Sequence, residues 1–405
     1  MTDQTAGKGI NINYTFLIIY LAGLSAFGSF VNDMYVPALP EMMKFFSCSV
    51  STVQLGLTTG MAGLAIGQFI LGPISDKYGR KPVLIWSLVL FCIAALISVF
   101  SPTIWFFLVF RLFQGIGASG GYFLARSIPS DIYSGRKLAK IMATVGAING
   151  FAPACSPVLG GYIDSWFDWK AIFIVLTIFA LLLLCFAHKL KETHQADKSV
   201  SLASEFGNYG KLLRNYRFMV HVMLKGSALG LLFAYISSGP FIVQTHFGYS
   251  QTTFGLIMGA NSILVAAGSM IALKFKVLKK AALVGAIGLT VAVIAEAAVL
   301  CFCDSFMGYE LLLLPMLFCL GMIFTVSNTL AMNEGRNFAG IASAVLGIVG
   351  YVFGAIASPL VGHGNILHST AVTFIVITAI VLICAILSSR IPADLDSDGQ
   401  NSTKQ

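Results

Sequence analysis

Two long apolar runs flank the stretch Gly72-Pro73-Ile74-Ser75-Asp76-Lys77-Tyr78-Gly79-Arg80-Lys81-Pro82. The glycines at 72 and 79 let the backbone approach its neighbours closely and turn. Pro82 suits the first turn of a following helix, where its missing N–H would have no partner in any case. The three basic side chains are typical of a connector on the cytoplasmic face of a membrane. The stretch therefore predicts a tight, charged turn at which one membrane helix ends and the next begins.

The composition places the whole chain in a membrane. Of its 405 residues, 57% are hydrophobic and only 10% are charged, and the mean hydropathy is +0.85. A soluble domain has about 25% charged residues. The net charge of +8 does not indicate a nucleic-acid partner, because the basic residues lie in connectors between apolar spans and form no binding stripe. The expected partners are the lipid bilayer and a small molecule.

Twelve segments are long and apolar enough to cross a bilayer, which takes about 20 residues of helix. They predict an all-α membrane protein with twelve transmembrane helices. The predicted spans are 14–37, 52–74, 82–101, 103–126, 137–162, 169–189, 218–245, 252–273, 281–302, 309–331, 339–362 and 368–389.

Lysine and arginine occur almost entirely in alternate connectors. Seventeen lie in one set of connectors and only two, Lys44 and Lys170, in the other set. Such an excess marks the cytoplasmic side of a membrane protein. We therefore expect a multi-pass protein of the cell inner (cytoplasmic) membrane with both termini in the cytoplasm.

The longest connector divides the spans into two sets of six. Part of it can form an amphipathic helix at the membrane surface, because Leu202, Phe206 and Tyr209 recur at steps of four and three. The alternative is a solvated linker. The predicted domains are a cytoplasmic N-terminal tail (1–13), an N-terminal six-helix bundle (14–189), a cytoplasmic linker (190–217), a C-terminal six-helix bundle (218–389) and a disordered cytoplasmic tail (390–405).

The order of glycines, acid and bases in the opening stretch resembles the signature between helices 2 and 3 of the major facilitator superfamily. The resemblance implies two pseudo-symmetric six-helix bundles, alternating access and a functional monomer. It also implies a conformational latch made by Gly72, Asp76, Gly79 and Arg80. Asp76 is expected near the N-terminus of the helix that begins at about Ala339, where a negative charge is stabilised. The latch would then hold the outward-open state.

Few ionisable residues lie inside the spans, and each is a candidate functional residue because a charge in hydrocarbon is costly. Asn32 and Asp33 precede the segment Met-Tyr-Val-Pro-Ala-Leu-Pro40. This region resembles the end of helix 1 in the Bcr/CflA (bicyclomycin and chloramphenicol efflux) branch of drug:proton antiporters. The resemblance implies that Asp33 faces the central cavity and exchanges a proton for substrate, with Asn32 as a substrate contact. Counting along the helix leaves the alternative of a hydrated residue at the outer interface.

The segment from Arg111 to Gly117 reads R-L-F-Q-G-I-G. It resembles the R-x-x-Q-G-x-G motif of helix 4 in the same transporters. A buried arginine needs acceptors or a carboxylate, so Arg111 is expected to adjust the proton affinity of the acid and to hold Gln114 in place, and both are predicted to contact substrate. The alternative is an arginine that snorkels to the outer surface.

The fifth span contains Asn149, Pro153, Pro157, Gly160 and Gly161. Each proline removes a helix hydrogen bond, and the small residues permit a neighbouring helix to come close. The segment resembles the antiporter motif of helix 5, although serine stands at position 156, where the motif usually has glycine. The resemblance favours antiport, and Asn149 is a predicted substrate contact. The alternative is a kinked packing helix without a functional role.

Two tyrosines inside the spans of the second half, Tyr235 and Tyr351, are predicted to line the substrate cavity. Each can instead make an ordinary hydrogen bond between packed helices. Glu296 and Lys225 are expected to lie at the membrane interfaces, with a part in coupling as the alternative.

The sequence does not indicate an enzyme or an ATP-driven pump. Its eight cysteines show no metal-ligand spacing, and it has no phosphate-binding G-x-x-x-x-G-K-[ST] loop and no hydrolase motif. We predict a proton-coupled secondary transporter that exports small lipophilic drugs or antibiotics, with no catalytic residue, metal or cofactor other than the coupling proton. The alternatives are a transporter of a physiological solute, such as a nucleoside, sugar, amino acid or siderophore, and a receptor or assembly factor that does not transport.

Overall fold

The computed structural model describes residues 13–133, 135–193 and 209–391. Among these residues, twelve helices are long and apolar enough to cross a membrane, which confirms the predicted all-α fold. The long helices are α1 (Tyr14–Asp33), α3 (Val50–Tyr78), α4 (Arg80–Val99), α5 (Ile104–Ile132), α6 (Gly135–Trp166), α7 (Trp169–Ala187), α9 (Tyr216–Pro240), α10 (Gln251–Ala272), α11 (Leu278–Phe302), α12 (Phe306–Glu334), α13 (Ala339–Leu360) and α14 (Ile366–Arg390). The shorter segments are η1 (Val36–Ala38), α2 (Leu39–Phe45), the π-helical turn η2 (Phe241–His246) and η3 (Arg336–Phe338).

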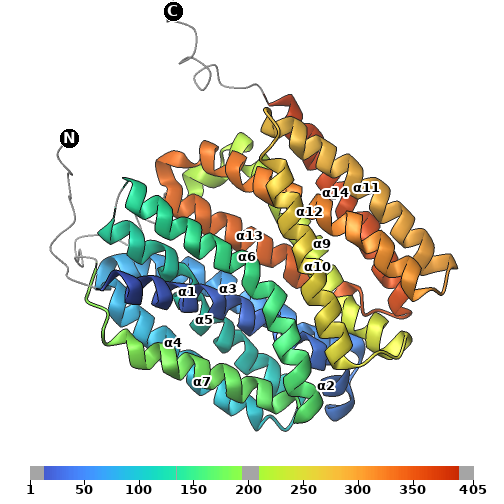
Figure 1. Ribbon diagram of the computed structural model, residues 1–405, viewed down its shortest axis with the longest axis horizontal. Coiled ribbons are helices and arrows are strands. Elements are labelled where there is room, and N and C mark those ends of the chain that lie inside the picture. The colour runs from blue at the N-terminus through green and yellow to red at the C-terminus, as the bar shows by residue number, and fades with distance from the viewer. Residues whose placement is uncertain (1–12, 134, 194–208, 392–405) are drawn as a thin grey trace, which may run out of the picture.

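The twelve helices form two bundles that lie side by side (Figure 1). Helices α1 to α7 make the N-terminal half, and α9 to α14 make the C-terminal half. Two helix pairs join the halves: α3 packs against α13, and α6 packs against α10. An even number of crossings returns the chain to the side on which it started, so α1 begins and α14 ends at the same end of the molecule.

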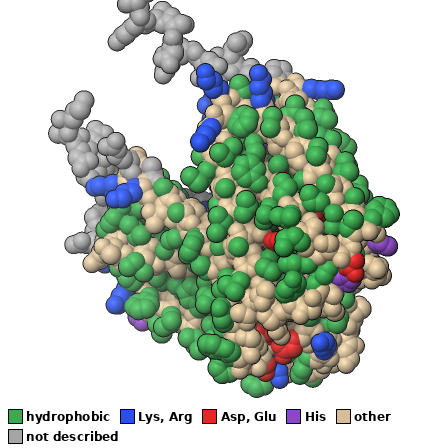
Figure 2. Space-filling view, turned by 45° about the vertical axis from the view of Figure 1, so that its right-hand side comes forward, with side chains coloured by type: hydrophobic (Ala, Val, Ile, Leu, Met, Phe, Trp, Pro, Cys, Tyr) green, Lys and Arg blue, Asp and Glu red, His purple; other side chains and the backbone are tan. Residues whose placement is uncertain are grey.

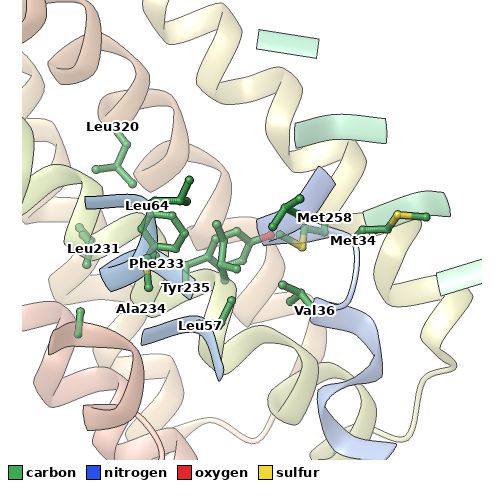
Figure 3. Packing of buried hydrophobic residues seen from close by; sticks show 14 of the residues in the cluster. Met34, Val36, Leu57, Leu64, Leu231, Phe233, Ala234, Tyr235, Met258 and Leu320 are labelled. Atoms are coloured by element: carbon green, nitrogen blue, oxygen red, sulfur yellow. The ribbon is translucent and has the colours of Figure 1, made fainter. Parts of the chain in front are cut away.

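The two halves are in contact at the end that lies opposite the chain termini. Gln54 Nε2 on α3 donates a hydrogen bond to the carbonyl oxygen of Ser237 on α9 at 3.0 Å. Gln244 Nε2 on η2 donates to the carbonyl oxygen of Pro37 at 2.9 Å. Buried apolar side chains from both halves fill the space beside these bonds, among them Met34, Val36, Leu57, Tyr235 and Met258 (Figure 3). This end of the molecule is closed.

Toward the chain termini the two halves diverge. Figure 2 shows a notch between them on this side, with Lys and Arg side chains on both lobes. A Cβ added to Gly340, at the start of α13, would meet no atom within 4 Å, whereas one added to Gly362, just beyond the other end of that helix, would collide with Gln54 Oε1. The cleft between the halves is therefore open at the end that carries the termini.

A single residue, Gly79, separates α3 from α4. Its φ of +100° lies in the region that residues with a Cβ avoid, and its N–H donates to the carbonyl oxygen of Ser75 at 3.0 Å. Pro82 lies in the first turn of α4, as predicted. The sharp turn is confirmed, but the two helices extend beyond the predicted limits at 74 and 82 and almost meet.

Residues 194–208 of the predicted linker lie outside the described residues, and with them Leu202 and Phe206 of the predicted amphipathic helix. Tyr209 and Leu212 are described, and both are buried against the C-terminal half beside Phe218. The Tyr209 ring also meets the ring of Phe69 on α3, with centroids 5.1 Å apart. The end of the linker thus contacts both halves.

Candidate functional site

Arg111 on α5 is completely buried, with 0% of its surface exposed. Three hydrogen bonds hold its guanidinium: Nη2 donates to the carbonyl oxygen of Val31 at 3.0 Å, Nε to that of Gly56 at 3.3 Å, and Nη1 to Gln114 Oε1 at 2.9 Å. The ring of Tyr35 lies 4.3 Å from the guanidinium carbon, which adds a cation–π contact. Arg111 therefore ties α1, α3 and α5 together through carbonyl acceptors, and the alternative of a snorkelling arginine is wrong.

Gln114 extends this network to α4. Its Nε2 donates to Ser98 Oγ at 2.8 Å, and Ser98 Oγ donates to the carbonyl oxygen of Ala95 at 2.8 Å. Gln114 and Ser98 are fully buried, so in this arrangement Gln114 supports Arg111 from inside the N-terminal half. A contact between Gln114 and substrate stays a prediction.

Asp33 is the last residue of α1 and is 7% exposed. Its burial excludes the alternative of a hydrated residue at the outer interface. Within the described residues no hydrogen bond reaches its carboxylate, but the Arg111 guanidinium lies within electrostatic range. Tyr351 on α13 is also within range, so Asp33 lies near the boundary between the two halves. The neighbouring Asn32 is buried too, and its Oδ1 has no partner among the described residues.

A polar cluster surrounds Tyr351 at that boundary. Arg126 on α5 donates from Nη2 to the hydroxyl of Tyr122 at 2.8 Å, and its guanidinium carbon lies 4.6 Å from the centre of the Tyr122 ring. Both Tyr122 and Arg126 lie within electrostatic range of Tyr351, and Gln68 on α3 faces its hydroxyl. The structure thus places Tyr351 near polar groups from the N-terminal half, and its contact with substrate stays a prediction. Arg126 was not singled out from the sequence because it lies near the end of a span, where a basic residue is ordinary.

Lys225 on α9 contributes a second positive charge to this cluster. Its Nζ donates to Asn328 Oδ1 on α12 at 2.6 Å. Lys225 and Arg126 lie within electrostatic range of each other although they belong to different halves. Lys225 is partly exposed, and its place at the membrane interface stays a prediction.

The predicted latch is centred on Arg80, at the start of α4. Its Nη1 donates to Asp76 Oδ1 at 2.5 Å and to Ser75 Oγ at 2.6 Å, and its Nε donates to Asp131 Oδ2 at 2.9 Å. Glu192 Oε1 accepts from the backbone N–H of Arg80 at 2.9 Å. The network joins α3, α4, α5 and the segment after α7 within the N-terminal half. The approach of Asp76 to the start of α13 stays a prediction, and Glu192 carried no sequence signal.

Helix α6, which carries the predicted antiporter motif, continues through Pro153 and Pro157 without a break. Both prolines therefore lie inside one helix, although each removes a helix hydrogen bond. The side chain of Asn149 lies outside the described residues, so its contact with substrate stays a prediction.

The two glycines of the motif lie at close approaches between segments of the backbone. A Cβ on Gly160 would collide with the carbonyl oxygen of Met34, and a Cβ on Gly161 would lie 2.6 Å from the carbonyl oxygen of Gln251 on α10. On the facing side, a Cβ on Gly255 would lie 2.5 Å from the carbonyl oxygen of Pro157. The motif therefore supplies the small residues that let α6 pack against α10 at the closed end.

The C-terminal half contains a buried acid and, near it, a second acid that is half-buried. Glu296 on α11 is 0% exposed, so the prediction that it lies at the interface is wrong. Glu310 on α12 lies within electrostatic range of it; it was not singled out because an acid near the start of a span is usually hydrated. Tyr235, predicted as a cavity residue, is buried and accepts a hydrogen bond from Asn261 Nδ2 at 3.2 Å. The described residues contain no group of three or more His, Cys, Asp or Glu side chains that could hold a metal ion.

Comparison with known proteins identifies relatives over nearly the whole chain. The family model described as Major Facilitator Superfamily matches residues 21–359. The chain is 35% identical over 396 residues to YdgK of Bacillus subtilis, an uncharacterised MFS-type transporter, covering 95% of this chain and 97% of that protein. It is 26% identical to a bicyclomycin resistance protein homologue of Haemophilus influenzae, covering 86% and 89%. It is 28% identical to the multidrug resistance protein MdtL of Shigella dysenteriae, covering 83% of each.

Solved structures share the fold at lower sequence identity. A bacterial homologue of the human lysosomal transporter Spinster superimposes with a TM-score of 0.75 at 15% identity, covering 93% of this chain and 97% of that one. The D-xylose–proton symporter gives a TM-score of 0.70 at 17% identity, covering 94% and 98%. The family match and the paired six-helix bundles show that this chain is a membrane transporter and not an enzyme, and that it belongs to the major facilitator superfamily, with resistance proteins of the Bcr/CflA type among its relatives.

Proposed function

We propose that this transporter exports small lipophilic drugs or antibiotics in exchange for protons, and that Asp33 carries the exchanged proton. The position of Asp33 is the observation that carries the proposal. It is a buried acid at the end of α1, within electrostatic range of the buried Arg111 and of Tyr351 from the other half. The names of the bicyclomycin and multidrug resistance relatives support the substrate class.

Arg111 is suited to act as a fixed positive charge in this exchange. Carbonyl oxygens and Gln114 occupy its donors, and an arginine does not lose its own proton in a protein. It therefore favours an ionised Asp33 from a distance and forms no ion pair that would hold the acid permanently charged. Because the positive charge of Arg111 is near Asp33 but not bonded to it, Asp33 can lose its proton when substrate enters and regain it when substrate leaves.

The open cleft faces the cytoplasm in this proposal, because the excess of Lys and Arg on the connectors at that end marks the cytoplasmic side. With both termini in the cytoplasm and the protein in the inner membrane, the structure corresponds to an inward-open state. A drug would enter the cleft as Asp33 releases its proton to the cytoplasm. After the halves rock, a proton from outside would neutralise Asp33 and the drug would leave.

The latch acts in the opposite state. Gly79 allows α3 and α4 to turn, and Arg80 stays anchored by Asp131. In the present state the expected close approach at Gly72 is absent, because a Cβ there would meet only Phe123 Cζ at an ordinary 3.8 Å. The side chain of Asp76 pairs with Arg80 but is 40% exposed, so it can also reach the N-terminus of α13 when the cytoplasmic ends of the halves come together. One chain supplies both halves of the cleft, and we therefore expect a monomer to transport.

The test is drug-induced proton movement in inside-out vesicles energised by respiration. Addition of a transported drug should release protons from vesicles with the wild-type protein, and Asp33→Asn should reduce that release to the level of empty vesicles. Asp304→Asn is the matched control, because Asp304 is an exposed acid at the outer surface that pairs with His246 at 2.6 Å; it should behave as the wild type. Equal release by Asp33→Asn and the wild type would refute the assignment of Asp33.

A second candidate function is transport of a physiological solute that carries an anionic group. Arg126 and Lys225, positive charges from opposite halves within electrostatic range of each other, favour it. The same vesicles should be challenged with anionic, neutral and cationic solutes. Proton-coupled movement of an anionic solute that Lys225→Met abolishes, together with no response to any drug, would select this alternative. A complete lack of flux would favour a receptor or assembly factor.

A further inference from the structure

The carboxyl group of Glu296 lies inside the C-terminal half without a hydrogen-bond partner. Glu296 is 0% exposed, and neither Oε1 nor Oε2 has a partner among the described residues. A carboxylate in such a place would lack both water and compensating bonds, and burying an uncompensated charge is strongly unfavourable. Six residues separate Glu296 from the end of α11 at Phe302, a distance of about 9 Å along the helix, so the group lies toward the closed end of the molecule.

The groups around Glu296 come mainly from α12. Glu310 is within electrostatic range, its Oε2 is buried without a partner, and the buried hydroxyl of Tyr309 also has none. Tyr235 on α9 completes the set of titratable neighbours, within range of Glu310 and Tyr309. Among the other packed helices, α10 has no acidic or basic residue, and the basic residues of α14 and of α11 itself lie at helix ends: His368, Arg390, Lys279 and Lys280. The nearest basic residue of α9, Lys225, lies ten positions before Tyr235. No positive charge of these described helices is therefore placed to neutralise Glu296.

We propose that Glu296 is a second proton-binding site, whose carboxyl group carries a proton in this closed arrangement. The proton removes a charge that the surroundings of Glu296 do not compensate. Ionisation of both Glu296 and Glu310 would also place two negative charges within electrostatic range of each other, and like charges repel. The role of this site in drug:proton exchange rests on the proposed function, whereas its binding of a proton is independent of that function.

A chain of contacts connects this site to the closed end. Asn261 on α10 interacts with Glu310 and donates from Nδ2 to the hydroxyl of Tyr235. Tyr235 lies among the apolar side chains that fill the contact between the halves, beside Leu57 and Met258 (Figure 3). Two residues further along α9, Ser237 accepts the hydrogen bond from Gln54 of the other half. Loss of the proton from Glu296 would place an uncompensated charge near Glu310, which interacts with Asn261, and would disturb the position of Tyr235. The protonated Glu296 therefore stabilises the closed arrangement.

The direct test is an infrared pH titration of the purified protein. The wild-type spectrum minus the Glu296→Gln spectrum should show the absorption of one protonated carboxyl group at neutral pH. Glu310→Gln should shift the titration midpoint of that absorption, because acids within electrostatic range of each other titrate together. Asp304→Asn, which removes an exposed acid, is the control and should leave this absorption unchanged. An ionised Glu296 at neutral pH, or a midpoint insensitive to Glu310→Gln, would overturn the proposal. So would a midpoint that depends on sodium concentration, since the oxygen atoms would then bind an alkali cation.

Drug-induced proton release separates this inference from the role of Asp33. If both sites take part, Glu296→Gln should lower the number of protons released per drug while leaving drug binding measurable, and Asp33→Asn should abolish exchange. If Glu296 titrates as proposed in the infrared spectrum, but Asp33→Asn exchanges drug for protons as the wild type does, the second site stands and the proposed role of Asp33 is refuted. The reverse result, an ionised Glu296 with exchange lost in Asp33→Asn, would remove the second site alone.

Discussion

Replacing Gly161 by alanine should open the closed end of the transporter. Gly161 lies on α6 where that helix meets α10 of the other half, and an added Cβ would lie 2.6 Å from the carbonyl oxygen of Gln251. Backbone atoms on both sides leave no flexible side chain that could move aside. Alanine would therefore push the two halves apart at this point, and the effect should fall on the contact between the halves more than on either half alone.

The magnitude follows from the contact distances. An ordinary contact would need about 3.4 Å, so α6 and α10 must separate by about 0.8 Å from the 2.6 Å that the glycine allows, a gap that loses a quarter to a half of the dispersion energy of the affected contacts. Overpacking of this kind costs about 1–3 kcal/mol. A free-energy difference of that size changes the ratio of two conformations about 5- to 150-fold. The closed end should then be open in a measurable fraction of molecules.

The assay measures the distance between two spin labels, one at position 44 and one at position 368. The labels are introduced into a protein whose eight native cysteines have been replaced. Lys44 and His368 are exposed and lie on opposite halves at the closed end. Gly161→Ala should add a population with a longer distance. Gly146→Ala, on the same helix, is the matched control because its Cβ would meet no atom within 4 Å. An unchanged distance distribution for Gly161→Ala, or the same change for Gly146→Ala, would refute the reasoning.

Three further substitutions test contacts that stabilise the N-terminal half, and their effects can be measured by thermal unfolding in detergent. Arg111→Met removes three hydrogen bonds and should cost about 2–4 kcal/mol; an unchanged melting temperature would mean that the network contributes no stability. Gly79→Ala should lower the free energy of unfolding more than Gly135→Ala. Both glycines have a positive φ, but only a Cβ at position 79 would collide with another residue. Equal losses of stability would contradict the close packing at Gly79. Asp131→Asn weakens the anchoring of the buried Arg80 and should cost about 1–3 kcal/mol, and a neutral effect would show that Asp76 alone suffices.

The sequence by itself determined the membrane class, the twelve spans and the turn at Gly79. These features follow from local properties: the length of an apolar run fixes a span, and a glycine beside a proline-started helix fixes a turn. The pairing of Arg111 with Gln114 was also predictable, because residues three apart on a helix are neighbours. Alternating charge on the connectors gave the expected orientation for the same local reason.

Only the tertiary structure decided what surrounds each intramembrane charge. Spacing along one helix does not tell which carbonyl oxygens of α1 and α3 will accept from Arg111, or that Glu310 will lie near Glu296. The prediction that Glu296 lies at the interface failed because distance from a span end measures depth in the membrane, whereas burial depends on the helices packed around it. The close approach at Gly161 is likewise a property of two facing backbones. Side chains from distant segments become partners only when the helices pack together, and no single stretch of sequence specifies that packing.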